Sequence, residues 1–146
     1  MTAPQVRLEQ IIDKLRAREF RLTPQRLAVL KILAESRNHP TAEQIYNQVR
    51  LDFPAISLAT IYKTVTLLKE IGELLELNTR DGSSHFDGNK PWRHSHVICT
   101  QCKNILDFED LPLGGLSNEA AARTGYRIID LQLDFFGLCP RCQVGK

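Results

Sequence analysis

Four cysteines stand in two pairs whose spacing suits a metal ion. Cys99 and Cys102 form one CxxC motif, and Cys139 and Cys142 form a second one. Two thiolates three positions apart can span one edge of a zinc tetrahedron, and a second pair supplies the opposite edge. The 36 residues between the pairs exceed the usual spacing of a zinc ribbon. We therefore predict a structural zinc that ties the end of the chain back to a distant segment.

Two other uses of paired cysteines compete with structural zinc. The CPRC motif could be a thioredoxin-like redox pair, but no βαβ pattern precedes it. A zinc deaminase also carries paired cysteines, but it needs an HxE motif where this chain has His94-Ser95-His96. The proline of the deaminase signature also precedes its cysteine, unlike Pro140 here. Structural zinc is therefore the favoured interpretation.

A second group of candidate ligands surrounds His94 and His96. On an extended strand these two residues point to one face while Cys99 points to the other, which predicts two separate metal sites. Imidazole and carboxylate ligands together suit Fe(II), Mn(II) or Zn(II) better than Cu(I) or Mg(II). Metal-free surface histidines are the plain alternative, and His85 could replace Asp87 as a ligand. The predicted second metal site consists of His39, Asp87, His94, His96 and Asp107.

The first half of the chain predicts four helices. Thr23-Pro24 provides an N-cap and a first-turn proline for the second helix. Thr41 and Gln44 form a capping box for the third, and Ser57 caps the fourth, which ends at Gly72. The apolar positions at helical spacing are Leu8, Ile11, Ile12 and Leu15 in the first helix, Leu27, Leu30 and Leu33 or Ala34 in the second, Ile45 and Val49 in the third, and Ile61, Val65 and Leu68 in the fourth.

Two short strand-like runs follow, at 73–78 and 84–87, and the Asp81-Gly82 pair between them is a hairpin signal. Three helices followed by a hairpin predict a winged helix-turn-helix, in which the helix at 57–71 enters the major groove. Residues 14–37 carry seven basic and two acidic side chains. A phosphate backbone would attract this positive charge, although a solvated helix face has the same composition.

The second half of the chain predicts a small sheet. Strands are expected at 93–99, 104–108 and 126–138, with a helix at 116–123. Ile129, Leu131, Leu133 and Phe135 alternate with polar residues, which is typical of a half-buried strand. About 55 residues with so few strands are marginal alone, so zinc and a partner subunit are expected to help. The predicted fold is α+β, with a winged-helix DNA-binding domain at 1–88, a linker at 89–92 and an α/β dimerisation and metal-binding domain at 93–146.

These motifs resemble those of the ferric uptake regulator family. The resemblance rests on RLTPQRLAVLKIL, HPTAEQIY, ISLATIYKTVTLLKEIGEL, HxHxxCxxC and FFGLCPRC, which occur in the family's order along nearly the whole chain. It implies a dimeric, metal-dependent DNA-binding repressor, often with a four-cysteine zinc. Asp107 is similar to the peroxide-sensing branch, where the iron-sensing branch commonly has glutamate. Leu131 replaces a histidine that is usual in the family, and the spacing from Asp87 to His94 is one residue longer than is typical.

The resemblance also implies which side chains meet DNA. Lys63 can bind guanine or phosphate, and Tyr62 can contact a thymine methyl group or the DNA backbone. Arg80, at the tip of the predicted wing, can reach phosphate. The predicted DNA-binding residues are Arg21, Ser57, Thr60, Tyr62, Lys63 and Arg80.

The resulting prediction is a cytoplasmic, homodimeric repressor and not an enzyme. The first twenty residues carry seven charged side chains and no apolar segment of signal-peptide length, and no run approaches a membrane span. The repressor would bind a palindromic double-stranded operator when Fe2+ or Mn2+ fills the second metal site, which would then be its regulatory site. Iron-catalysed oxidation of His39 or His94 by peroxide would release the repressor from the operator. The alternatives are a sensor of iron or zinc level and, from another class, a zinc enzyme.

Overall fold

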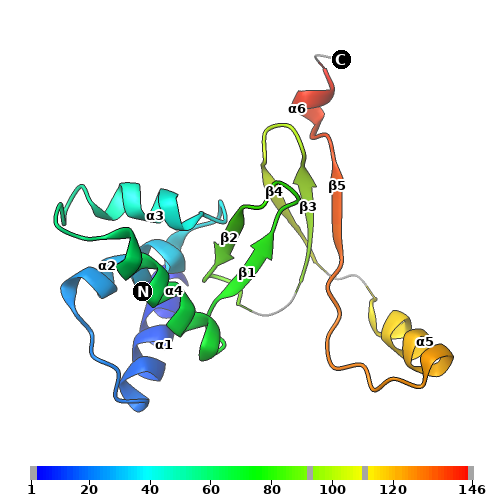
Figure 1. Cartoon of the computed structure of the whole chain (residues 1–146), viewed down its shortest axis with the longest axis horizontal. Coiled ribbons are helices and arrows are strands. Elements are labelled where there is room, and N and C mark those ends of the chain that lie inside the picture. The colour runs from blue at the N-terminus through cyan, green and yellow to red at the C-terminus, as the bar shows by residue number, and fades with distance from the viewer. Residues whose placement is uncertain (1–2, 92–93, 110–111, 145–146) are drawn as a thin grey trace. The chain divides into compact units, whose positions relative to one another are not determined.

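The computed structural model describes residues 3–91, 94–109 and 112–144. The chain divides into two compact units, Met1–Trp92 and Arg93–Lys146. Helices fill most of the first unit and a small sheet forms the centre of the second, so the predicted α+β class is confirmed (Figure 1). None of the helices in the described part of the chain is long and apolar enough to cross a membrane.

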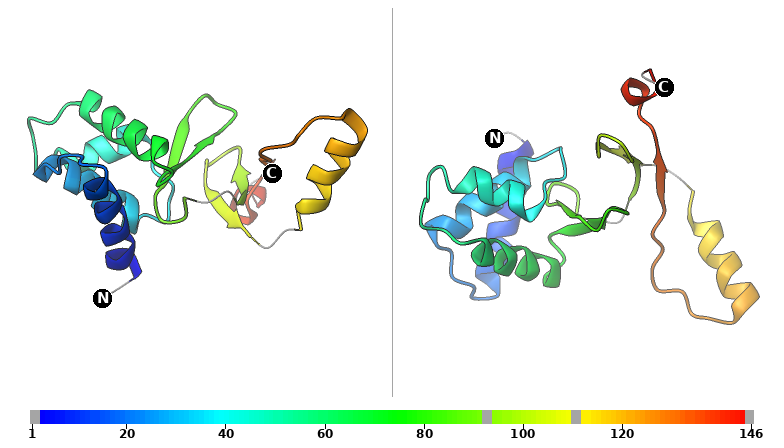
Figure 2. Two further views of the ribbon diagram at one scale, coloured as in Figure 1. Left: turned by 90° about the horizontal axis from the view of Figure 1, so that it is seen from below. Right: turned by 45° about the horizontal axis from the view of Figure 1, so that its top comes forward.

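The N-terminal unit consists of four helices followed by a hairpin. The elements are α1 (Ala3–Ala17), α2 (Pro24–Glu35), α3 (Ala42–Val49), α4 (Leu58–Glu70), β1 (Leu75–Asn78) and β2 (Ser84–Asp87). Figures 1 and 2 show the hairpin leaving the C-terminal end of α4. Strands β1 and β2 pair antiparallel, and Gly82 takes a φ of 85° in the turn between them. The order of α2, α3, α4 and the hairpin matches the predicted winged helix-turn-helix.

Polar side chains start three of these helices where the sequence predicted. The Thr23 hydroxyl accepts the backbone N–H of Arg26 at 3.1 Å. Thr41 and Gln44 form the reciprocal capping box of α3, and Ser57 accepts the N–H of Thr60 at the start of α4. Each cap satisfies a backbone donor that has no partner within its own helix. These local hydrogen bonds explain why the helix starts could be predicted.

The core of the N-terminal unit lies among its helices. Fully buried side chains such as Leu15, Leu30, Ile45 and Ile61 come from all four of them. One predicted core residue is wrong, because Leu27 is 40% exposed. The buried stripe of α2 is centred on the side of Val29 and Leu33, so Leu27 falls at its margin in the first turn.

The C-terminal unit is built on a three-stranded sheet in the order β4-β3-β5. Strand β3 pairs antiparallel with β4 and parallel with β5. Helix α5 buries none of its described side chains and stands away from the sheet (Figure 1). The elements of this unit are β3 (Ser95–Cys99), β4 (Ile105–Phe108), α5 (Gly114–Thr124), β5 (Asp134–Gly137) and α6 (Pro140–Gln143).

The long last strand predicted for 126–138 is wrong over most of its length. Only Asp134–Gly137 forms a strand, and Arg93, where the first strand of this unit was expected to begin, lies outside the described residues. Tyr126 is 74% exposed and Ile129 is 90% exposed. A strand needs a hydrogen-bonding neighbour, and of this segment only Asp134–Gly137 pairs with β3 in the described part of the chain.

Candidate metal centres and DNA-binding face

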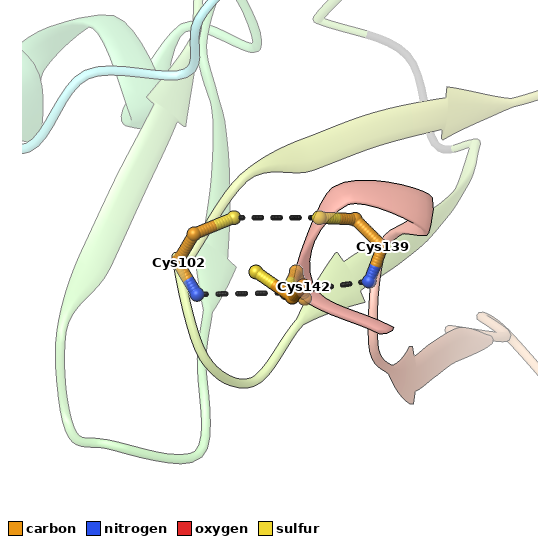
Figure 3. A group of neighbouring side chains, drawn as sticks. Cys102, Cys139 and Cys142 are labelled. Carbon is orange, nitrogen blue, oxygen red and sulfur yellow. Dashed lines mark hydrogen bonds between the residues drawn. The ribbon is translucent and has the colours of Figure 1, made fainter. Parts of the chain in front are cut away.

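The four cysteines converge at one end of the sheet in the C-terminal unit. Their sulfur atoms all lie within 4.8 Å of one another. Cys99 ends β3, Cys102 lies in the turn before β4, Cys139 follows β5, and Cys142 lies on α6. Cys102 and Cys139 face each other (Figure 3), and their sulfur atoms are 3.8 Å apart. The structure therefore brings together the two pairs that the sequence assigned to zinc.

The electrostatics of this cluster also suit a divalent cation. The backbone N–H groups of Cys139 and Cys102 donate to the Cys99 sulfur at 3.4 and 3.5 Å, and they lower the pKa of the Cys99 thiol to about 5. The pKa of Cys142 is raised to about 12, because it hydrogen-bonds Cys139, is partly desolvated and faces the other sulfurs. Four neighbouring thiolates repel one another unless a cation compensates them, so the donor set fits Zn2+.

A second cluster in the same unit joins two imidazoles and a carboxylate. The Nε2 atoms of His94 and His96 lie 3.1 and 3.5 Å from Oδ1 of Asp107. The two imidazole rings are 4.4 Å apart between centroids. Asp107 stands opposite His96 in the β3–β4 register. The structure thus places these three predicted ligands together and gives them a nitrogen and oxygen donor set that fits Fe(II), Mn(II) or Zn(II).

Asp134 is the residue of this cluster that sequence reasoning missed. Its Oδ1 lies 3.2 Å from Nδ1 of His96, and the parallel pairing of β3 with β5 places it opposite His96. Burial lowers the pKa of His96 more than the hydrogen bond to Asp134 raises it, so the ring is held neutral, as a metal ligand requires. In the sequence, Asp134 was recognisable only as one of the polar residues that alternate with apolar ones in the last predicted strand.

The N-terminal unit places the other two predicted ligands next to each other. Nε2 of His39 lies 3.3 Å from Oδ2 of Asp87, and both side chains are buried. Oδ1 of Asp87 accepts the backbone N–H groups of Asn89 and Lys90 at 3.0 and 2.8 Å. This carboxylate therefore both faces an imidazole and fixes the turn that follows β2.

His85 has a different position from the one the sequence left open for it. Its Nδ1 lies 2.7 Å from the backbone oxygen of His39 and donates a hydrogen bond to it. His39 adopts a φ of 51°, in the left-handed region that few residues other than glycine occupy. His85 helps to hold this backbone, and Asp87 is the residue whose ligand atom faces His39.

The predicted DNA-binding residues of α4 lie on the side of the helix away from the core. Tyr62 and Lys63 are exposed, whereas Ile61 and Val65 are buried. The Tyr62 hydroxyl donates to the Glu43 carboxylate at 2.8 Å. Ser57 and Thr60 lie at the N-terminal end of this helix, Arg80 lies in the hairpin turn, and Arg21 precedes α2; Ser57, Arg80 and Arg21 are exposed and Thr60 is half-buried.

Comparison with known proteins gives one consistent result. The profile of the ferric uptake regulator family matches residues 17–136. The peroxide-responsive repressor PerR of Staphylococcus aureus (strain Mu50 / ATCC 700699) is 41% identical over 136 residues, which are 93% of this chain and 91% of that protein. The solved structure of PerR from Streptococcus pyogenes has a TM-score of 0.53 at 31% identity, covering 93% of this chain and 92% of that one.

A third relative is similar in fold. The Helicobacter pylori ferric uptake regulator Fur has a TM-score of 0.78 at 22% identity, covering 98% of this chain and 95% of that one. The family profile spans most of the sequence, and the S. aureus repressor matches it along nearly its whole length. This chain therefore belongs to the ferric uptake regulator family.

Proposed function

We propose that this chain is a homodimeric, metal-dependent repressor that releases its DNA operator when hydrogen peroxide oxidises a histidine of the regulatory metal site. The observation that carries this proposal is the cluster of His94, His96 and Asp107, which is separate from the four cysteines. A protein that needed zinc only for its fold would have no use for a second, nitrogen and oxygen donor set. The similarity to the peroxide-responsive repressor of S. aureus supports the same reading.

The two donor sets would hold different metals. Thiolates select Zn2+ for the structural site, made by Cys99, Cys102, Cys139 and Cys142, whereas imidazole and carboxylate suit Fe2+ or Mn2+ at the regulatory site. Fe2+ bound there would catalyse the reaction of peroxide next to the ligand imidazoles. In the balanced reaction the ring of His39 or His94 would lose two electrons and gain one oxygen atom, and the second oxygen of hydrogen peroxide would leave as water.

The full regulatory set in this proposal draws on both units. His94, His96 and Asp107 come from the C-terminal unit, and His39 and Asp87 come from the N-terminal unit. A metal bound by ligands from both units would favour one spacing between the two copies of helix α4 in the dimer, which are the helices proposed to enter the major groove. Since operator half-sites are separated by about one helical turn of DNA or a multiple of it, a wrong spacing loses the contacts of one subunit. The metal can shift this equilibrium only by its differential affinity for the two arrangements.

Residues 1–88 would act as the DNA-binding domain, 89–92 as the linker and 93–146 as the dimerisation and metal-binding domain. Helix α4 would lie in the major groove, and the hairpin turn would contact the backbone. The side chains that we assign to DNA are those placed at the exposed side of α4, in the hairpin turn and before α2 (Arg21, Ser57, Thr60, Tyr62, Lys63 and Arg80).

Operator binding by iron-loaded and manganese-loaded protein, each with and without peroxide, tests this function. We expect both metals to support binding, and only the iron form to release DNA on oxidation. Mass spectrometry should then find one added oxygen on the peptide that carries His39 or His94. The His39→Ala variant should lose metal-dependent DNA binding and keep its zinc, because His39 lies in the other unit from the four cysteines.

Three results would argue against peroxide sensing through iron. Equal release of the manganese form would show that redox chemistry at the metal is not needed. Oxidation of the cysteines before the histidines would indicate a thiol switch. DNA binding that follows metal concentration and ignores peroxide would indicate a sensor of metal level.

A further inference from the structure

One row of side chains crosses the sheet of the C-terminal unit through His96. The antiparallel register places Asp107 of β4 opposite His96, and the parallel register places Asp134 of β5 opposite it on the other side. His96 therefore has a carboxylate at each ring nitrogen, with Nε2 3.5 Å from Asp107 and Nδ1 3.2 Å from Asp134. The two carboxylates have different tasks, because only Asp107 also approaches His94.

The contact with Asp134 determines which nitrogen of His96 carries the proton. An ionised carboxylate only accepts hydrogen bonds. The contact of Nδ1 with Asp134, at 3.2 Å, is shorter than that of Nε2 with Asp107, at 3.5 Å, and so favours Nδ1 as the nitrogen that donates and holds the hydrogen of the neutral ring. The lone pair then lies on Nε2, which is the nitrogen on the side of Asp107 and His94. A neutral imidazole binds a metal through the nitrogen that lacks the proton.

Asp134 is itself held in place. Its second oxygen, Oδ2, accepts a hydrogen bond from Nε2 of Gln132 at 3.0 Å. Its side chain is only 9% exposed, and His96 is fully buried. In such surroundings a charge-assisted hydrogen bond is weakly screened and resists rotation of the ring.

From this geometry we propose that Asp134 is a positioning residue of the regulatory metal site, which holds His96 in its Nδ1–H form with Nε2 presented to the metal. In this role Asp134 acts through its hydrogen bond with His96. Gln132 in turn holds Asp134 in place through its hydrogen bond to Oδ2. This inference rests on the proposed function, because it assumes that a divalent cation binds beside His96.

Binding of Mn2+ to the full-length, zinc-loaded dimer provides the first test. We expect Asp134→Ala to weaken Mn2+ binding by roughly 10–100-fold, the usual effect of losing a partner of a ligating histidine. Asp134→Asn should lose less, because its amide oxygen can still accept the Nδ1–H hydrogen bond. Asp130→Ala and Asp130→Asn are matched controls from the same segment, since the Asp130 carboxylate accepts the backbone N–H of its own neighbour, Leu131, and they should leave Mn2+ affinity unchanged.

The ring tautomer provides a readout that general destabilisation would not change in the same way. The chain has four histidines, so 15N spectra of the imidazole rings can be assigned by substituting each in turn. His96 should be in the Nδ1–H form in the wild type before Mn2+ is added, and a mixture of tautomers should appear in Asp134→Ala. The wild-type spectrum alone decides this point even if a variant fails to fold.

Each outcome separates this inference from the function on which it rests. An Nε2–H ring in the metal-free wild type, or equal Mn2+ affinity in the Asp134 and Asp130 variants, overturns the role of Asp134. Direct coordination of Mn2+ by the Asp134 carboxylate would also overturn it and make Asp134 a ligand. Wild-type protein that binds no Mn2+ through His96 would instead refute the regulatory site itself.

Discussion

The two units of the chain bury apolar side chains to very different extents. The described core cluster lies wholly in the N-terminal unit, between Ile11 and Phe86. In the described part of the C-terminal unit the buried apolar side chains are Ile98, Cys99 and Ile105. A domain of this size with so little apolar burial does not offset the entropy lost on folding. The N-terminal unit is therefore stabilised by packing, and the C-terminal unit needs metal ligation and a partner subunit.

The surface of the C-terminal unit indicates where the partner subunit contributes. Leu106, Leu116, Tyr126 and Ile129 are each more than half exposed. Several large apolar side chains exposed on a unit this small are typical of surfaces that another chain covers. The alternating segment at 126–133, which has no strand partner within the described chain, carries two of these residues, Tyr126 and Ile129. The dimer of the proposed repressor would bury these residues.

The largest difference between the units should appear when zinc is removed. We expect Cys99→Ser or Cys142→Ser to lose zinc and the dimer, because structural zinc binding contributes on the order of 10 kcal/mol or more of folding free energy. Zinc content, light scattering and circular dichroism would measure the loss. The N-terminal helices should keep their structure, because their core forms within the N-terminal unit and the four cysteines belong to the C-terminal unit.

The control for this prediction is Ser95→Ala, which removes a side chain oxygen from β3 and leaves all four sulfurs. It should remain a zinc-loaded dimer. A Cys99→Ser, Cys142→Ser double variant that is dimeric and stable without metal would contradict the structural role of zinc.

The converse substitution removes packing from the N-terminal unit. Leu30 is fully buried, and Leu30→Ala should cost about 2–5 kcal/mol, the usual cost of a large-to-small change in a core. Thermal unfolding followed by helical circular dichroism should show a lower midpoint, while zinc content and the dimer stay unchanged. Leu27→Ala is a matched control in the same helix, since Leu27 is 40% exposed and should lose far less. Equal losses would mean that the core boundary drawn in α2 is wrong.

The same contrast decides how much of the structure could be predicted from the sequence. Thr23, Thr41 and Ser57 start helices through hydrogen bonds to residues three positions on, so local sequence was enough. The extent of β5 depends on which strand lies beside it, and alternation at 126–138 carries no information about the partner. The sequence therefore predicted the elements of the N-terminal unit better than those of the C-terminal unit.

The residues of the metal sites also differ in how well the sequence predicts them. The paired cysteines and the HxH motif can be recognised by their spacing, and the structure places them in two groups. Asp134 does not, because a polar residue in an alternating strand looks like any solvent-facing one. Only the parallel register with β3 brings it to His96. Residues that act through a ligand need long-range pairing to be recognised, whereas ligands can be recognised from local motifs.

A smaller effect is expected at the DNA-binding face of the N-terminal unit. Lys63→Ala should weaken operator binding by about 1–3 kcal/mol if Lys63 reads a base, and by less, with a shallower salt dependence, if it contacts phosphate. Binding isotherms at several salt concentrations would distinguish the two. Lys69→Ala is the matched control on α4, because Lys69 is paired with Glu76 at 2.7 Å. Identical isotherms for wild type and Lys63→Ala would remove this part of α4 from the interface.

The smallest effect concerns an ion-pair cluster that ties α1 to the segment after α4. Arg7 and Lys14 contact the carboxylate of Glu73 at 2.6 and 2.7 Å. Burial alone would raise the pKa of Glu73, but the hydrogen bonds from Lys14 and Arg7 outweigh it and hold this pKa below its ordinary value. A lowered pKa means that the folded state binds the proton less tightly than the unfolded chain. The stabilisation is therefore present above the ordinary pKa of glutamate, about 4.3, and is lost as the pH falls through the folded pKa.

Glu73→Gln should remove this part of the acid dependence. The variant should be less stable than the wild type at neutral pH, and the difference in the free energy of unfolding should shrink as the pH falls below the ordinary range of a glutamate carboxyl. Urea unfolding followed by helical circular dichroism would measure it. Glu70→Gln is the control, because Glu70 is an exposed residue at the end of α4 and should show no such dependence. A difference between Glu73→Gln and wild type that stays constant with pH would mean that Glu73 acts through packing and not through its charge.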